Sequence, residues 1–383
     1  MMHIYVLSLF LTLLLVFNID SSFAKSLSEI YDKPMVLSLG RDCCSKDVKQ
    51  KGCCAKKKEC RLIEEGGRQK LKAPLGLPDL DIPADNPMSC GKVVLGKKLY
   101  FDTRLSFDDT VSCATCHDLM LSGTDAGAVS TGINGQKGGR SAPPSVNAAY
   151  MDTQFWDGRA PTLEEQAKGP PTNPIEMGMP SHDFLVEKLK GIDEYRKHFQ
   201  KVFGGEITID NVVKAIAAYE RTLLSGNSPF DRFRYGGEDN AISELAKLGM
   251  EVFAGKGRCI TCHPFTASYA LFSDNNFHNL GVGINSKNPD LGRYLVTGKE
   301  KDKGAFKTPS LRNIALTAPY MHDGSEHTLE EVVEFYDRGG NRNPNLDGAI
   351  TPLNLTYTEE VALVEFMKSL TSRDMPGVCG KHR

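Results

Sequence analysis

The sequence predicts a mainly α-helical protein made of two related modules joined by long loops. The first observation behind this is a repeated pentamer, CATCH at residues 113–117 and CITCH at residues 259–263. The second is the order of elements, because an apolar helix precedes each pentamer and another helix closes each half. The gap from the histidine to the closing helix is about 92 residues in the first half and about 95 in the second, as a repeat requires. No alternating apolar run is long enough to support a major sheet.

Apolar periodicity places the helices of both halves. In the first half, the segment 93–100 is rich in apolar residues, and a closing helix is expected near residues 210–224. In the second half, a helix is expected near residues 243–253 and a closing helix near residues 358–370. The residues predicted to share one face of these helices are Val212, Val213, Ile216 and Leu223, then Leu245, Leu248 and Val252, then Val361, Val364 and Leu370.

The composition is that of a large soluble protein. The chain has 383 residues, of which 40% are hydrophobic and 25% charged, and its length suggests two domains. Lys and Arg number 46 against 48 Asp and Glu, for a net charge of −2. Because phosphate binding requires a basic excess, we do not expect nucleic acid as a partner. The 20 prolines and 36 glycines indicate long irregular connections.

The N-terminus has the features of a secretory signal peptide over residues 1–24. Its apolar run at residues 4–17 spans about 14 residues, which is short for a membrane span. The segment SFA at residues 22–24 has the small-x-small pattern of a cleavage site, so the mature chain would begin near Lys25. An uncleaved membrane anchor is the alternative. In either case we expect the rest of the chain in the periplasm or an equivalent exported compartment, where disulfides can form.

Residues 25–90 form a Cys/Lys-rich N-terminal extension without apolar periodicity. It could be a small disulfide knot, a metal clip or a flexible segment, and we expect a poorly ordered, disulfide-linked tail. The two expected domains then cover residues 91–235 and 236–383. The chain has 11 cysteines, and since that number is odd they cannot all pair within one chain. Outside the two pentamers the pairing stays open for Cys43, Cys44, Cys53, Cys54, Cys60, Cys90 and Cys379.

The pentamers carry the chemistry, because CxxCH is the attachment motif of haem c. Two thiols three positions apart can reach both vinyl groups of one porphyrin, and the adjacent histidine can ligate the iron. Composition alone would produce only about 0.007 such pentamers in this chain. A redox dithiol or half a zinc site would not need a histidine after each CxxC. We therefore expect two covalently bound haems c, held by Cys113, Cys116, His117, Cys259, Cys262 and His263.

Several longer segments resemble one known family. They are LGKKLYFDTRLS, SCATCH, FWDGRAPTLEEQAKGP, NPIEMGMP, FHNLGV, GAFKTPSLRNIALTAPYMHDGS and TLEEVVEFYDRGG. In this order they resemble the bacterial di-haem cytochrome c peroxidases and their MauG-like relatives. The resemblance covers residues 92–373 but not residues 25–90. It implies two cytochrome c-like domains, each binding one haem, with the two haems on either side of the domain interface.

The resemblance also implies roles for the haems and for three residues. The first haem would react with hydrogen peroxide, and the second would exchange electrons with a partner. Trp156 matches the family's tryptophan between the haems, Glu176 its acid/base carboxylate, and Gln166 an amide of the same pocket. Trp156 could instead be core filling and Glu176 a surface carboxylate. We favour the functional interpretation, because a carboxylate whose pKa is raised by burial can move a proton between the two oxygens of peroxide.

An inter-domain calcium site is a further implication of the resemblance. Thr317 and Pro319 match its carbonyl ligands, whereas the usual asparagine is replaced by Ser141. Carbonyl ligands do not depend on the side chain, so Ca²⁺ remains an expected cofactor.

The first departure from the family concerns Ile133. Many family peroxidases place a histidine on the open side of the first haem at rest. The matching position here is Ile133, and no histidine lies between His117 and His182. Since isoleucine cannot ligate iron, we expect the first haem to be five-coordinate or water-bound at rest and to react without prior reduction.

The second departure is Tyr336, where some relatives have methionine and MauG-like members have tyrosine as the far ligand of the second haem. Leu329, Val332, Val333 and Tyr336 also follow the spacing of a buried helix face, behind a capping box formed by Thr328 and Glu331. Met321 and its neighbour His322 are rival ligands by spacing. With the resemblance we choose Tyr336. Methionine raises the reduction potential, whereas an anionic tyrosinate favours higher oxidation states.

Three functions follow from these residues. The preferred one is a MauG-like enzyme that uses hydrogen peroxide and oxidises a partner protein or another reductant, with oxidising equivalents shared between the haems through Trp156. The second is a cytochrome c peroxidase supplied with electrons by a small cytochrome c or a cupredoxin. The third, from a different class, is a di-haem electron-transfer or sensor protein with weak peroxidase activity. Members of the family are often homodimers, so a homodimer is compatible with the resemblance.

Overall fold

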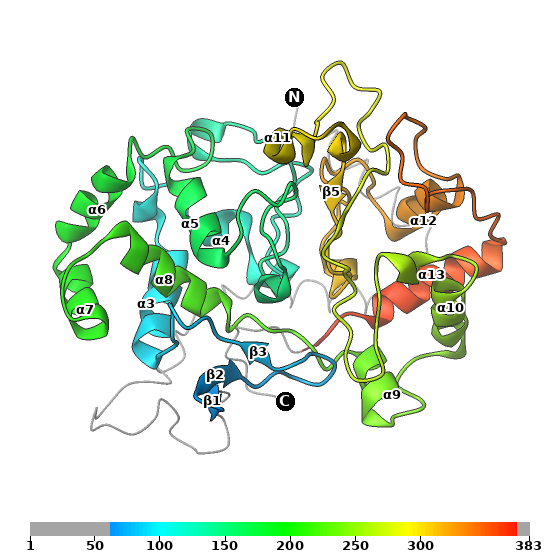
Figure 1. The fold of residues 1–383 in the computed structure, drawn as a ribbon, viewed down its shortest axis with the longest axis horizontal. Coiled ribbons are helices and arrows are strands. Elements are labelled where there is room, and N and C mark those ends of the chain that lie inside the picture. Colours follow the sequence, from blue (N-terminus) through cyan, green and yellow to red (C-terminus); the bar gives the residue numbers. More distant parts are fainter. Residues whose placement is uncertain (1–61, 374–383) are drawn as a thin grey trace, which may run out of the picture. The chain divides into compact units, whose positions relative to one another are not determined.

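The computed structural model describes residues 62–373, which all belong to one unit covering residues 56–383. These residues are mainly helical, with two small antiparallel sheets (Figure 1). The expected signal peptide and six of the cysteines outside the pentamers, at positions 43, 44, 53, 54, 60 and 379, lie outside the described residues. Over residues 62–373, no helix combines the length and the apolar character needed to cross a membrane.

The helices fall into two groups along the chain, with short strands before the first group and within the second. The N-terminal group is α3 (Cys90–Tyr100), α4 (Cys113–Cys116), α5 (Leu163–Thr172), α6 (His182–Lys190), α7 (Asp193–Phe203) and α8 (Ile209–Glu220). The C-terminal group is α9 (Pro229–Gly236), α10 (Glu244–Ala254), α11 (Tyr294–Thr297), α12 (Leu329–Asp337) and α13 (Tyr357–Ser369). The strands are β1 (Leu62–Glu65), β2 (Arg68–Leu71), β3 (Leu80–Asp81), β4 (Phe277–His278) and β5 (Phe306–Lys307). Short 3₁₀ helices are η1 (Thr103–Leu105), η2 (Leu119–Leu121), η3 (Ile133–Gly135), η4 (Ala148–Tyr150), η5 (Cys259–Thr261), η6 (Glu300–Asp302) and η7 (Ile314–Leu316).

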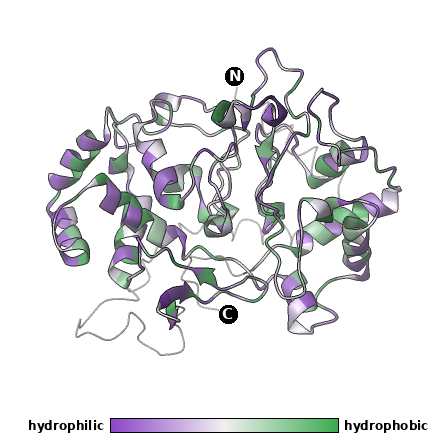
Figure 2. Cartoon of the chain, viewed as in Figure 1, coloured by the Kyte–Doolittle hydropathy of each residue, from purple (hydrophilic) through white to green (hydrophobic). Residues whose placement is uncertain are grey.

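Each group of helices has its own hydrophobic core. The first core is built from residues between Leu95 and Leu223, and the second from residues between Phe230 and Leu370. Helices in both groups carry a hydrophobic and a hydrophilic face (Figure 2). This separation of the buried side chains agrees with the repeat expected from the pentamers.

The repeat is visible in two helix crossings of the same kind. Helix α3 packs on α8 in the first core, and α10 packs on α13 in the second. A Cβ atom added to Gly96 of α3 would lie 1.8 Å from the carbonyl oxygen of Ala215, and one added to Gly249 of α10 would lie 1.9 Å from that of Ala362. In both halves a glycine therefore lets two helix backbones approach more closely than any other residue would allow.

Replacing Gly96 by alanine is expected to destabilise the protein by about 1–3 kcal/mol, the usual cost of overpacking. A loss of stability would be informative, because alanine in a helix interior is otherwise about 1 kcal/mol more favourable than glycine and would raise the free energy of unfolding. Denaturant unfolding of the haem-loaded protein would measure the change. Gly348 is the matched control, because nothing lies within 4 Å of a Cβ placed there. A G96A variant as stable as G348A would contradict the close crossing.

The loop after each CxxCH motif repeats as well. Asn147 and Asn313 both adopt the left-handed conformation, with φ of 65° and 59°, and begin η4 and η7. The backbone N–H of Asn147 donates to Leu223 just after α8, and that of Asn313 donates to Leu370 just after α13. Each loop is thereby tied to the closing helix of its own half, and this holds the histidine segments against the cores.

The expected helices are present, but the prediction of which face of α10 is buried is wrong. Helices α3, α8, α10 and α13 match the predicted segments, and the Thr328–Glu331 capping box of α12 is confirmed. In α10, however, Leu245 and Leu248 are exposed, at 36% and 37%. The buried stripe runs through Ala246, Gly249, Val252 and Phe253 instead. The close approach of α13 at Gly249 sets this rotation, which favours small residues over leucines.

Residues 62–90 differ from the poorly ordered tail that we expected for the extension. Strands β1, β2 and β3 form an antiparallel sheet with the order β1-β2-β3. Leu71, Leu77, Leu80, Ile82 and Met88 bury their side chains in a third core together with Leu224. Cys90 is disulfide-bonded. The strands are too short to produce a periodic signal in the sequence, so only their packing reveals them.

Candidate active site

The two pentamer histidines have the same environment. The Nδ1–H of His117 donates to the carbonyl oxygen of Gly123, and that of His263 to the carbonyl oxygen of Phe272, both at 2.8 Å. This bond fixes the tautomer and leaves Nε2 of each ring available as a metal ligand. Burial lowers the pKa of both imidazoles, so that both rings are neutral at pH 7. Neutral, oriented imidazoles are what an axial haem ligand requires.

The second CxxCH motif opens into a cavity of about 210 Å³ with a mainly apolar lining. Cys259, Cys262 and His263 all line it, and both thiols are free of disulfides. Apolar side chains from α12 and α13, including Leu329, Val333, Leu363 and Met367, complete the wall. A hydrophobic cavity with two thiols and a histidine nitrogen at one end fits a haem bound through thioethers.

All three candidate far ligands of the second haem line this same cavity. Tyr336 projects from α12 into this cavity. Burial is the main cause that raises the pKa of its phenol, and the nearby thiols of Cys259 and Cys262 contribute less. Met321 lines the cavity from the loop before α12, where it has a left-handed φ of 70°. The ring of His322 is stacked on that of Phe306, with centroids 3.6 Å apart and planes 15° apart. The structure therefore places all three predicted rivals around one cavity.

Ile133 and Glu176 meet in the first half, near the first pair of thiols. Ile133 is buried at 5% exposure, and its N–H donates to the backbone carbonyl of Glu176 at 3.0 Å. Its Cδ1 lies only 2.2 Å from where a Cβ on Gly178 would be. Burial is the main cause that raises the pKa of the Cys113 thiol, to about 12, and of the Cys116 thiol, to about 11, and the charge of Glu176 makes a smaller contribution to both.

The Glu176 carboxyl is held rather than mobile. Burial raises its pKa above 4.5, while the charge of Arg159 and a hydrogen bond from Asn173 lower it. The Asn173 amide donates to Oε1 at 2.8 Å. The other predicted pocket residue, Gln166, lies on α5 and is half-buried; over residues 62–373 its side-chain amide makes no hydrogen bond. Glu176 is thus a partly desolvated carboxyl poised to exchange a proton.

Trp156 is tied to both halves of the molecule. Its indole N–H donates to the carbonyl oxygen of Ser141 at 3.0 Å. Ser141 in turn donates its N–H to the carbonyl oxygen of His322 at 2.8 Å and its hydroxyl to that of Met321 at 3.1 Å. Trp156 also lines the large cavity and a second one of about 50 Å³. A short hydrogen-bonded path therefore joins the indole to the loop of the candidate far ligands.

An ion-pair network holds the loop of Trp156 in place. Arg140 bonds Asp157 in the first half and Asp290 in the second, each at 2.7 Å. Ser141, Thr317 and Pro319, the residues expected at the calcium site, all line the large cavity, and the calcium site stays a prediction.

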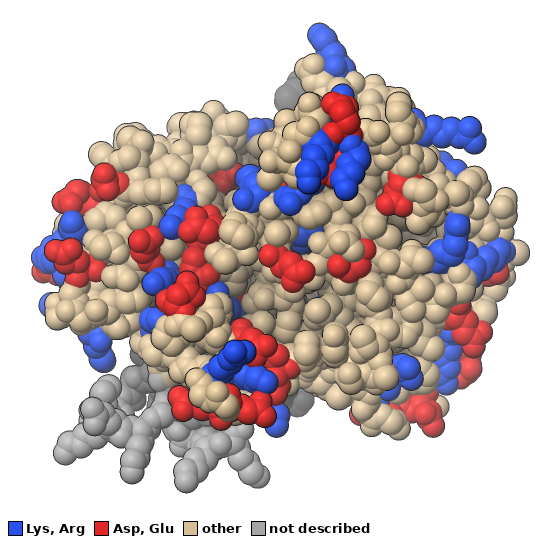
Figure 3. Space-filling view, viewed as in Figure 1, with Lys and Arg blue, Asp and Glu red and all other residues tan. Residues whose placement is uncertain are grey.

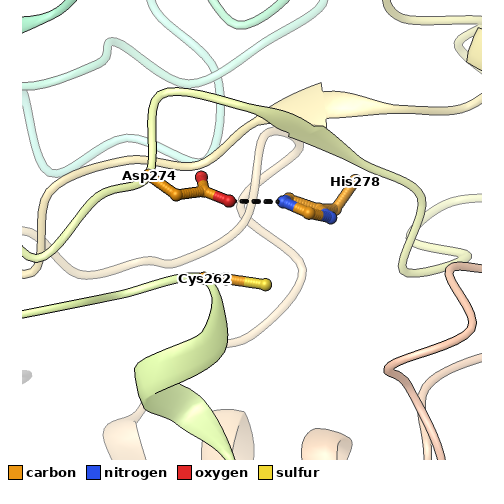
Figure 4. Close-up of side chains that lie close together, drawn as sticks. All are labelled: Cys262, Asp274 and His278. Carbon is orange, nitrogen blue, oxygen red and sulfur yellow. Dashed lines mark hydrogen bonds and ion pairs between the residues drawn. The ribbon is translucent and has the colours of Figure 1, made fainter.

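His278 is a site residue that the sequence reasoning missed. It lies between Asp274 and Asp347, with nitrogen–oxygen distances of 2.9 Å and 2.6 Å, and faces Cys262 (Figure 4). The Cys262 thiol, Asp347 and Asp274 raise the pKa of His278 to about 10. Cys262, Asp274 and His278 have the spacing of a metal site, but the Cys262 sulfur is the one expected to bind haem. The segment FHNLGV, quoted above for the resemblance, was the available signal.

The protein is mainly helical, and each half has an oriented histidine directly after a CxxC pair. The chain belongs to the di-haem cytochrome c peroxidase/MauG family, and it is accordingly a di-haem peroxidase-type oxidoreductase. The family model for di-haem cytochrome c peroxidase matches residues 91–240.

The chain is similar both to MauG proteins and to cytochrome c peroxidases. The methylamine utilization protein MauG of Methylorubrum extorquens is 39% identical over 307 residues, which cover 79% of this chain and 84% of that protein. Cytochrome c551 peroxidase of Nitrosomonas europaea is 40% identical over 303 residues, which cover 78% of this chain and 85% of that protein. Among solved structures, a MauG-like protein associated with microbial copper homeostasis superposes with a TM-score of 0.71 and 33% identity, over 78% of this chain and 95% of that one.

Proposed function

We propose that the chain is an exported di-haem c enzyme that reacts with hydrogen peroxide at an open first haem and oxidises a partner protein or another reductant in the manner of MauG. Ile133 carries this proposal. It occupies the position of a resting histidine ligand, it is buried, and its backbone is bonded to that of Glu176. Because its side chain has no ligand atom, the pocket beside Glu176 stays open to peroxide without prior reduction.

Glu176 performs the proton transfer in this proposal. When bound, the first haem supplies a redox-active iron at which peroxide is reduced. The Glu176 carboxylate accepts the proton of the near peroxide oxygen and returns it to the leaving oxygen. Asn173 orients the carboxyl through its bond to Oε1, and Gln166 on α5 would supply the second polar group of this site, as the resemblance implies. Burial raises the pKa of Glu176, which makes its carboxylate a stronger base for the peroxide proton.

Trp156 connects the two haem sites, and Tyr336 adjusts the second one. The hydrogen bond from the indole to Ser141 supports Trp156 as the relay through which oxidising equivalents are shared. Tyr336 would hold the second iron as a tyrosinate, and a haem with that ligand would favour high oxidation states. In this proposal residues 91–235 and 236–383 are the two cytochrome c-like domains, Thr317 and Pro319 bind Ca²⁺ through their carbonyl oxygens, and the protein acts in the periplasm or an equivalent compartment.

A cytochrome c peroxidase is the second candidate, and Met321 favours it. Met321 lines the same cavity as Tyr336, and methionine ligation would raise the potential enough to accept electrons from a small cytochrome c or a cupredoxin. Over the face seen in Figure 3, acidic and basic groups are interspersed, so charge does not single out a docking surface for such a donor.

Tyr336→Phe is expected to change the optical and EPR spectra of the second haem, because phenylalanine cannot ligate iron. Met321→Leu is the matched variant and should leave these spectra unchanged. The reverse pattern would assign Met321 as the ligand and would move the proposal toward the peroxidase.

The resting, oxidised protein is expected to show a high-spin ferric EPR signal from the first haem. A wholly low-spin spectrum would contradict the open site.

Stoichiometric peroxide is then added, and optical, near-infrared and Mössbauer spectra are recorded. A long-lived species oxidised by two equivalents, with the spectra of both irons changed, supports the MauG-like function. Rapid decay with turnover of reduced cytochrome c supports the peroxidase, and absence of reaction supports an electron-transfer protein.

A further inference from the structure

Lys307 lies between the two haem sites, at the end of strand β5. Its side chain lines the large cavity together with Cys259, Cys262 and His263. It also lines the smaller cavity, where Trp156 is a neighbour. The backbone N–H of Lys307 donates to the carbonyl oxygen of Trp156 at 2.8 Å. Lys307 is thereby adjacent to Trp156 and lines the space for the second haem.

Over residues 62–373, Lys307 has no carboxylate within ion-pair distance and its ammonium group makes no hydrogen bond. Both arginines that line these cavities have hydrogen-bond partners for their guanidinium groups. Arg312 bonds both oxygens of Asp231 at 2.9 Å, and Arg258 bonds the carbonyl and hydroxyl oxygens of Thr351. The nearest acidic influence on Lys307 is the charge of Asp152, and burial lowers the pKa of Lys307 to about 8.

Lys307 is half-buried and lines a mainly apolar cavity. A charged ammonium group is poorly solvated in such a place, so an anion that enters the cavity would bind beside it favourably. Haem carries two propionate carboxylates on the edge opposite its vinyl groups. Thioether bonds would hold the vinyl edge at Cys259 and Cys262, and these two residues line the same cavity as Lys307. The propionates are thus anions of suitable charge that would enter this cavity with the haem.

We propose that Lys307 binds a propionate of the haem attached at Cys259 and Cys262 and thereby raises the reduction potential of that haem. The inference rests on the proposed haem attachment. The physical reason for the effect is electrostatic, because a positive charge near the porphyrin stabilises ferrous iron relative to ferric iron. Without the ammonium group the propionate charge is uncompensated, which favours the ferric state and raises the pKa of the propionic acid.

The test is a spectroelectrochemical titration of the second haem in the haem-loaded full chain, from pH 5.5 to 9. The variants are K307M, which removes the charge at similar length, and K307R, which keeps it. Lys303 provides the control K303M, because it lies on the same loop with a side chain 45% exposed. Pyridine haemochrome and mass spectrometry first establish that two haems are bound. If K307M does not load both haems, K307Q is measured in its place.

At the wild-type midpoint potential, the ferric-to-ferrous ratio of the second haem should rise roughly tenfold in K307M, which corresponds to about 59 mV for a one-electron couple. Its potential should also rise with falling pH as the propionate is protonated. The propionate bending band in resonance Raman spectra should shift. K307R and K303M should resemble the wild type. Unchanged potentials and pH profiles in K307M or K307Q, with both haems bound, would overturn the assignment of Lys307. Absence of the second haem from the wild type would instead overturn the proposed function.

Discussion

Replacing Glu176 by glutamine is expected to lower kcat/KM for hydrogen peroxide by about 100-fold to 10,000-fold, the usual contribution of a positioned acid/base group. Glutamine keeps the shape and can still accept the hydrogen bond from Asn173, but it cannot accept the peroxide proton. Stopped-flow mixing of the oxidised protein with peroxide measures the loss. Both haems and the resting spectrum should be retained, because Glu176 attaches to neither haem.

The pH dependence gives the same experiment a second readout. Burial raises the pKa of Glu176 above 4.5, and only the deprotonated form can take the proton. The rate should therefore increase with pH through this raised pKa in the wild type, and that acid limb should be absent from E176Q. Glu187→Gln is the control, since Glu187 is a surface residue whose side chain is 72% exposed. An E176Q rate within twofold of E187Q would reject Glu176 as the acid/base group.

Replacing Arg312 by methionine is expected to destabilise the protein by about 3–5 kcal/mol, because it leaves the Asp231 carboxylate buried without a partner. The two side chains are only 2% and 0% exposed. Arg312 also donates to the carbonyl oxygens of Gly76 and Ala270. One guanidinium thus fastens the N-terminal strands to the second half, and its loss removes all of these bonds at once.

Denaturant unfolding of the haem-loaded protein measures this cost. The surface variant R196M is the control, since the Arg196 side chain is 52% exposed. The double variant D231L/R312M should be less destabilised than the sum of the single variants, because no unpaired charge remains. If R312M loses less than about 1 kcal/mol, the level of a surface pair, the buried pair has no structural role.

Much of the candidate site could be read from local sequence. CxxCH is a contiguous motif, so both thiols and the iron-ligating nitrogen are specified within five residues. The positions of the helices could be predicted from apolar periodicity, because that pattern is also contained in a short stretch of sequence. Leu245 and Leu248 were misplaced because the face that α10 buries depends on the approach of α13 at Gly249, which is not encoded in α10 alone. The strands in residues 62–90 were missed because two to four residues give no usable period.

Contacts between residues far apart in the chain could not be predicted from the sequence. His278 gains its role only when Asp274, Asp347 and Cys262 come together, and Asp347 is 69 positions away in the chain. Lys307 is an ordinary lysine in the sequence, and its position between two cavities emerges only from packing.

The sequence by itself determined the positions of the two CxxCH motifs, the mainly helical class, the family and the absence of a ligand atom at residue 133, because each depends on residue identity or short spacing. Only the tertiary structure decided that the half-buried Glu176 is held by Asn173, that Trp156 is bonded through Ser141 to the loop of Met321 and His322, and that Arg312 closes a buried pair with Asp231. The physical reason is that desolvation and charge pairing depend on which side chains surround a group, and those neighbours come from segments far apart in the chain.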